Sequence, residues 1–354
     1  MSCGSVVGTG FGTVAVMKTD QTRVQQTFRT LRRSGLLFVL CIWFVAENAG
    51  ALVRTATALG TSGSLTAAWG SETTEAASRS RYVNWMTGEL NADVAIAEKR
   101  GCKTAEAGTG GTSVLAFGRQ VRGIGTRSFT WQGNLYPYNH LEQVALAYMA
   151  GMERCTTGPL GTLAVTTSNY HLDDVDEAAL HGRQWQEFVN RIREANHTKV
   201  VVSGGIDLEP GWGGADAARS WMVSWRAAGE TAIVVNASAD GCPASGAGGN
   251  CANGWNTDLL AELTWGRAGD LALPQIYRHD GVQAAQWGVL SRVATRSGLE
   301  PQFAGAMTQV RACSQGPNRN CAQLSLDPDG ARTQLQAAVG NEFDVPHGTD
   351  IGWG

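Results

Sequence analysis

The 354-residue sequence alternates short apolar or β-branched runs with segments whose apolar residues follow a helical period. Seven such runs start 31 to 48 residues apart, which leaves room for one helix between neighbouring strands. The intervening segments repeat apolar residues at i, i+3, i+4 and i+7, as in the stretch 185–192. Continuous apolar strands that alternate with helices are typical of a parallel sheet covered by helices. The seven runs are residues 113–120, 161–168, 199–207, 232–238, 270–277, 301–309 and 347–353.

Seven strand and helix units favour a closed barrel, because an open sheet of that length leaves two edges to protect. We therefore predict an α/β fold, a TIM-type (β/α) barrel over residues 113–354, with the eighth strand either unrecognised or beyond Gly354. An open doubly wound sheet is the alternative. No G-x-G-x-x-G motif opens a helix after the first run, which weakens a dinucleotide-binding interpretation.

The N-terminal segment is typical of a leader. Arg32 and Arg33 precede an eleven-residue apolar stretch at 36–46, and small residues follow at 49–51 and 56–58. We expect residues 1–58 to be a signal peptide with an upstream basic segment, and the mature protein to be extracellular. A single anchor helix is the alternative, but eleven apolar residues are short for about 30 Å of hydrocarbon, so we expect no stable membrane insertion after processing. Residues 59–112 form a lead-in with one helix around 82–99.

The charge balance bears on partners. Residues 1–58 hold six Lys or Arg and two Asp or Glu, so the remainder carries a formal net charge of −7. An acidic chain with few lysines is a poor ligand for a polyanion. We expect no nucleic-acid binding.

Six cysteines follow the leader, an even number that indicates disulfides in a secreted chain. Two pairs each bracket a short loop, and the remaining two cysteines are left to each other. Their spacing does not match a zinc site, in which paired cysteines are two to four residues apart. The predicted pairs are Cys102 with Cys155, Cys242 with Cys251, and Cys313 with Cys321.

Candidate catalytic residues stand in the sequence GGIDLEPGW, where Asp207 and Glu209 end the third recognisable strand. Residues two apart on a strand point to the same side, and barrel chemistry sits at the carboxyl ends of the strands. Repulsion between the two carboxylates raises the pKa of one, which gives a protonated acid beside an ionised partner. Glycoside cleavage needs such a pair, and we predict Glu209 as the general acid and Asp207 as its partner. The alternative is a structural pair, with one carboxylate bound to an arginine or capping the next helix.

Other strand ends supply polar and aromatic groups suited to a sugar. A tryptophan three residues past Glu209 could stack on a pyranose face, although it could equally pack a loop. The predicted substrate-binding residues are Trp212, Asn236, Asp240, Gln275 and Tyr277.

Several motifs carry a resemblance to known proteins. The order D-L-E-P-x-W at 207–212, A-S-A-D-G-C-P at 237–243, C-A-N-G-W at 251–255, P-Q-I-Y at 274–277, G-A-M-T-Q at 305–309 and T-D-I at 349–351 resembles an uncharacterised family of secreted, glycoside-hydrolase-like barrel proteins from actinobacteria. The D-x-E and the later Q-x-Y are more distantly similar to family-18 chitinases and family-25 lysozymes. That likeness implies Glu209 as the acid with Asp207 as its partner. The longer D-x-x-D-x-D-x-E pattern of family 18 is incomplete, since Val202 and Gly205 stand at its first two acidic positions.

Three functional classes remain open. The preferred one is a secreted glycosidase that acts on cell-wall or environmental polysaccharide without cofactor or metal. The second is a glycan-binding barrel without catalysis, because fold alone does not establish activity. The third is a metal-dependent hydrolase that uses Asp207, Glu209, Asp240 and Asp350 as oxygen ligands.

Overall fold

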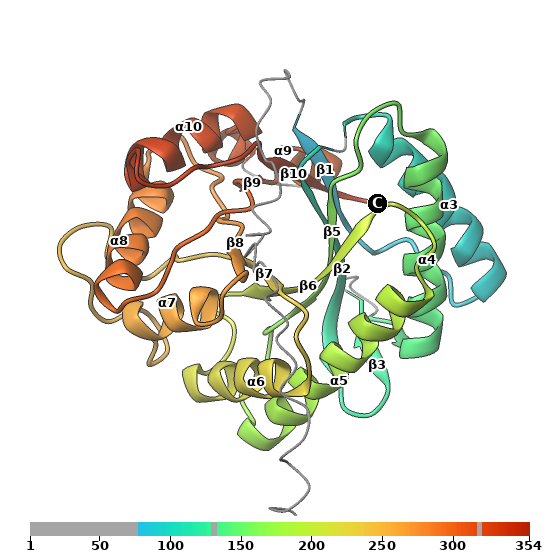
Figure 1. Ribbon diagram of the computed structural model, residues 1–354, viewed down its shortest axis with the longest axis horizontal. Helices are drawn as coiled ribbons and strands as arrows, with labels where there is room; N and C mark the ends of the chain where they lie inside the picture. Colours follow the sequence, from blue (N-terminus) through green and yellow to red (C-terminus); the bar gives the residue numbers. More distant parts are fainter. Residues whose placement is uncertain (1–76, 109, 129–132, 317–320) are drawn as a thin grey trace, which may run out of the picture. The chain divides into compact units, whose positions relative to one another are not determined.

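A computed structural model describes residues 77–108, 110–128, 133–316 and 321–354 (Figure 1). The predicted leader at 1–58 lies outside the described residues. None of the described helices is long and apolar enough to cross a membrane.

The described chain forms an α/β fold around one curled sheet, in which eight parallel strands follow the order β8-β7-β6-β5-β2-β1-β10-β9. A short antiparallel hairpin, β3 (Gly125–Arg127) and β4 (Leu135–Pro137), extends from β2. Each of the seven predicted runs contains or overlaps one parallel strand. These are β2 (Thr112–Val121), β5 (Thr162–Ser168), β6 (Val201–Leu208), β7 (Ile233–Ala237), β8 (Leu271–Ala272), β9 (Met307–Thr308) and β10 (Thr349–Trp353).

The eighth strand is β1 (Ser78–Tyr82), which lies between β10 and β2. It falls in the segment that the sequence pattern assigned to a lead-in, so the sheet begins well before residue 113. The sequence SRSRY contains no apolar run, so its pattern does not indicate a buried strand. Its inward-facing serines can be buried because they are hydrogen-bonded: Ser80 Oγ lies 2.7 Å from Thr349 Oγ1 and accepts the amide of Val114 at 2.7 Å. The helix expected around 82–99 spans Leu90–Ala105.

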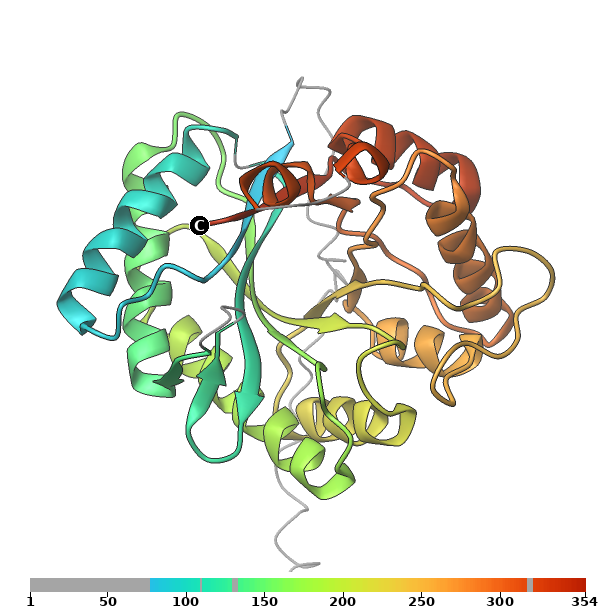
Figure 2. The same ribbon diagram turned by 180° about the vertical axis from the view of Figure 1, so that it is seen from behind.

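Helices cover the outer face of the sheet (Figures 1 and 2). Some begin at side-chain caps, as where Asp174 Oδ1 accepts the amide of Glu177 at 2.7 Å and Asn256 Oδ1 that of Leu259 at 2.8 Å. The described helices are α3 (Leu90–Ala105), α4 (Tyr138–Cys155), α5 (Val175–Ala195), α6 (Ala215–Ala228), α7 (Thr257–Trp265), α8 (Val282–Arg296), α9 (Val310–Gln315), the 3₁₀ turn η1 (Cys321–Leu324) and α10 (Pro328–Val339).

Successive side chains of each strand point to opposite faces of the sheet, and this alternation produces two hydrophobic clusters. The larger one lies between sheet and helices and takes the bulky side chains, including Trp185, Trp221 and Trp225. The smaller one lies inside the curl, where β2 contributes only Val114 and Ala116. The inward residues Val114 and Ala116 are small to medium in size, and the charged inward residue of β6, Asp207, stands near the carboxyl end of its strand.

The two end strands of the order, β8 and β9, are each two residues long. They are linked by isolated parallel bridges, Ala272 to Phe303 and Gln275 to Met307, and not by a continuous ladder. The sheet is therefore curled like a distorted barrel but is not a closed one.

Three disulfides have the predicted pairing, Cys102–Cys155, Cys242–Cys251 and Cys313–Cys321. The first joins α3 to α4, whose backbones touch because Gly101 and Gly151 carry no side chain. A Cβ on either glycine would collide with a carbonyl of the opposite helix. Disulfides are typical of oxidising compartments.

Candidate functional site

Neighbouring strands bring three predicted residues together at the carboxyl end of the sheet. Asp207 on β6 is in register with Asn236 on β7, and Gln275 follows β8. The side-chain amide of Gln275 donates to Asp207 Oδ1 at 2.6 Å and to the carbonyl of Asn236 at 3.3 Å. Asp207 is only 1% exposed. The structure therefore brings these three candidate residues together, and Gln275 fixes one oxygen of the buried carboxyl.

The backbone of Glu209 is held by Asn169, which follows β5. Asn169 Oδ1 accepts the amide of Glu209 at 3.0 Å, and Asn169 Nδ2 donates to its carbonyl at 2.9 Å. The amide of Trp212 donates to the same carbonyl at 3.1 Å. These bonds fix the direction in which the partly buried Glu209 leaves the end of β6.

Burial perturbs both carboxyls. It raises the pKa of Glu209 to about 7, with the negative charge of Asp240 adding to the effect and the hydrogen bond of Gln275 opposing it. It also raises the pKa of Asp207 well above its usual range, with repulsion from Glu209 as the next cause and Gln275 again opposing. The sequence predicted one protonated and one ionised carboxyl. Instead both resist ionisation, because desolvation acts on each, and the pair retains a proton near neutral pH.

Two tyrosines face this pair. Tyr277 lies two residues beyond Gln275, and Tyr82 ends β1. Burial raises the pKa of each hydroxyl above its ordinary value, and the charges of Asp207 and Glu209 raise it further. Both hydroxyls therefore stay protonated. They are also hydrogen-bonded to each other, so the pair has one remaining proton to donate to a ligand beside the carboxyls.

Trp353 at the end of β10 stands beside Tyr82, with ring centroids 4.5 Å apart and planes tilted by 31°. Sequence reasoning missed both aromatics. The signal for Trp353 was available, since it is two residues beyond Ile351, which faces the interior. No such signal existed for Tyr82, because β1 itself was not recognised.

Asp240 lies at the rim and not in the inner cluster. Its side chain is 56% exposed and pairs with Arg278 at 3.5 Å. Gln283 also donates to it at 3.5 Å, while Gln283 Oε1 accepts the amide of Tyr277 at 2.7 Å. Asp240 and Tyr277 are thus positioned by the same glutamine.

Trp212 is placed on the rim between the loops that follow β5 and β6. It meets Tyr170 edge to face, with centroids 5.6 Å apart. Tyr170 is 44% exposed and also contacts the ring of His171. The structure groups Trp212 with these aromatics, and its stacking on a sugar stays a prediction.

The predicted metal-ligand set does not come together. Asp350 faces outward, where its oxygens accept the Thr308 hydroxyl at 2.8 Å and the amides of Val310 and Arg311 at 2.9 and 3.2 Å. It therefore anchors the start of α9 and is separated from the inward carboxyls by the sheet. The hypothesis of a four-carboxylate site that includes Asp350 is wrong.

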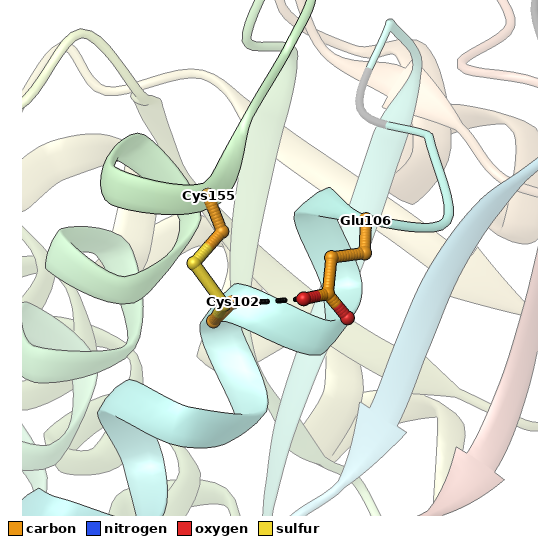
Figure 3. Close-up of side chains that lie close together, drawn as sticks. All are labelled: Cys102, Glu106 and Cys155. Carbon is orange, nitrogen blue, oxygen red and sulfur yellow. Dashed lines mark hydrogen bonds between the residues drawn. A yellow bond between two sulfur atoms is a disulfide. The ribbon is translucent and has the colours of Figure 1, made fainter.

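Another group with potential ligand atoms lies on the outside, where Cys102, Glu106 and Cys155 gather at the ends of α3 and α4 (Figure 3). The two sulfurs are joined in a disulfide, so neither is a thiolate. Cys102 Sγ lies 3.6 Å from Glu106 Oε1, a contact without a shared proton because a disulfide sulfur carries none. The group therefore offers a metal one carboxylate only.

No protein-family model matches this chain, and a search of curated proteins finds no match.

Proposed function

We propose that the protein is a secreted glycoside hydrolase with a distorted TIM-type barrel, acting on cell-wall or environmental polysaccharide. The observation that carries the proposal is the buried pair Asp207 and Glu209, whose pKa values are both raised at the carboxyl end of the sheet. The hydrogen-bonded hydroxyls of Tyr82 and Tyr277 and the ring of Trp353 add polar and apolar groups beside the pair, which is the mixture a pyranose requires.

In this mechanism Glu209 gives its proton to the glycosidic oxygen as the bond from that oxygen to the anomeric carbon breaks. When the single proton of the pair is on Glu209, Asp207 is ionised, and it stabilises the positive charge that develops on the ring or orients the attacking water. That water adds to the anomeric carbon and gives its proton to the pair, which restores protonated Glu209. Gln275 holds Asp207 so that one of its oxygens remains directed at the reacting sugar. A pKa of about 7 keeps a useful fraction of Glu209 protonated at neutral pH.

The test is reducing-sugar release from peptidoglycan, chitin and β-glucans, with wild type beside Glu209→Gln and Asp207→Asn. We expect either substitution to lower turnover by roughly 10² to 10⁴ while leaving folding and glycan binding nearly intact. Glu230→Gln is the matched control, because Glu230 is an exposed carboxyl outside the site.

Other outcomes contradict the proposal in distinct ways. Glycan binding by wild type without turnover would make the protein a binding module. Turnover that persists in Glu209→Gln would remove this residue from the mechanism. Turnover abolished by a chelator would point to a metal-dependent hydrolase.

A further inference from the structure

The outer face of β1 carries an arginine, Arg81, that has no acidic partner in the part of the chain that the structure describes. Arg81 is 3% exposed, and its Nε donates to the Thr104 hydroxyl of α3 at 3.1 Å. Among the described residues no carboxylate oxygen lies within 4.0 Å of its guanidinium. A buried charge is costly unless it is paired, and a single neutral hydroxyl does not neutralise it.

Two further guanidinium groups approach Arg81 from the flanking helices. Arg311 of α9 lies over Gly352, which is the partner of Arg81 in the β1–β10 ladder; a Cβ there would be 3.0 Å from Arg311 Cζ. Arg100 of α3 is held over the ring of Trp85 at 5.4 Å, and its Nε is buried without a partner. These helices flank β1 and β10 (Figure 2).

Arg81 repels both of the other guanidinium groups. After burial, the charge of Arg81 is the next cause that lowers the pKa of Arg100 and of Arg311. Arg79, the next outward residue of β1, lowers the pKa of Arg311 as well. The nearby acid, Asp350, already accepts two amides and a hydroxyl, so it offsets only part of this charge.

We propose that Arg81, Arg100 and Arg311 form a binding site for a tetrahedral oxyanion, a phosphate or sulfate group, on the outer face of β1 and β10. The planar guanidinium group can donate two parallel hydrogen bonds to two oxygens of such an anion, which makes arginine a preferred protein partner of phosphate. Gly352 contributes by its lack of a side chain, which lets Arg311 lie flat on the strand beside Arg81. The site faces away from Asp207 and Glu209 and does not depend on the proposed glycosidase activity.

The experiment measures thermal unfolding of the purified, disulfide-bonded protein in chloride, phosphate and sulfate at equal ionic strength. We expect phosphate or sulfate to raise Tm saturably by about 2–4 °C, because a ligand that binds only the folded state stabilises it. Arg100→Gln and Arg311→Gln should each weaken the apparent affinity at least tenfold. Arg219→Gln is the matched control, since it removes an exposed arginine that pairs with Glu262.

A second readout separates binding from a merely structural role. In chloride, repulsion from Arg81 opposes the contacts that Arg100 makes with Trp85 and that Arg311 makes with the Asp350 carbonyl. Arg100→Gln and Arg311→Gln should therefore unfold at about the same temperature as wild type in chloride. If the two variants lose the same amount of Tm relative to wild type in chloride as in phosphate, the proposal is overturned. It is also overturned if the Tm of wild type is no higher in phosphate or sulfate than in chloride.

Comparison of inorganic phosphate with glycerol phosphate identifies the source of the group. Tighter binding of glycerol phosphate would show that the site takes a phosphate ester, and tighter binding of inorganic phosphate that it takes the free ion. Either result supports the site, and absence of binding by phosphate, sulfate and ester alike rejects it.

Discussion

Replacing Gln275 by methionine removes the side-chain amide that donates to Asp207 while keeping a side chain of similar length. A hydrogen bond to a charged group contributes about 1.5–3 kcal/mol, and 1.36 kcal/mol corresponds to one pKa unit. Gln275 lowers the pKa of both Asp207 and Glu209, so its removal must raise them. We expect the titration of Glu209 to move from about 7 upward by roughly one unit or more.

The assay is carbon-13 NMR titration of the side-chain carboxyls in wild type and Gln275→Met. It reports the pKa values directly and needs no turnover. If the protein is catalytic, the alkaline limb of its pH profile should move in the same direction. Gln323→Met is the control, because Gln323 is exposed on η1. A Glu209 pKa that falls or stays unchanged in Gln275→Met would refute the assigned role of the amide.

Further expectations concern pH, disulfides and nucleic acid. Burial raises the folded-state pKa of Glu209 above its unfolded value. The stability that protonated Glu209 contributes is therefore fully present below about pH 4.5 and is lost as the pH rises through about 7. Urea unfolding should show a smaller fall in the free energy of unfolding from pH 5 to pH 8 for Glu209→Gln than for wild type. Removing the Cys102–Cys155 bond, which spans 53 residues, should cost about 4 kcal/mol, and removing Cys242–Cys251, which spans 9, should cost about 2.6 kcal/mol. An inverted order in urea unfolding would contradict the loop-entropy account. Gel-shift titration should detect no DNA or RNA binding at physiological salt; a salt-sensitive shift at micromolar protein would contradict this expectation.

The sequence pattern located most of the sheet because parallel strands that are buried on both faces have nearly continuous apolar sequences. It missed β1, whose inward serines bond to neighbouring strands instead of packing. It also overestimated the lengths of β8 and β9, because apolar composition does not reveal where a ladder loses its register.

For the site, the register of β6 with β7 and the hydrogen bond from Gln275 bring Asp207, Asn236 and Gln275 together, and the sequence had named all three as candidate residues. The same alternation, applied to β10, would have excluded Asp350 from an inward metal site and included Trp353. The electrostatics of the pair could not be predicted, since they depend on burial: repulsion alone separates two pKa values, whereas desolvation raises both.

The backbone pairing between β8 and β9 is interrupted, so the curled sheet has a line of weak backbone pairing between these two strands. Four backbone hydrogen bonds cross it, two made by residue 272 and two by residue 307. Tyr277 lies on one side of this line, and Tyr82 and Trp353 lie on the other. Separation of the two backbones along this line would move the two tyrosines apart without breaking a continuous ladder. Amide hydrogen exchange should therefore be faster at Ala304 and Met307 than in the centre of β5 or β6.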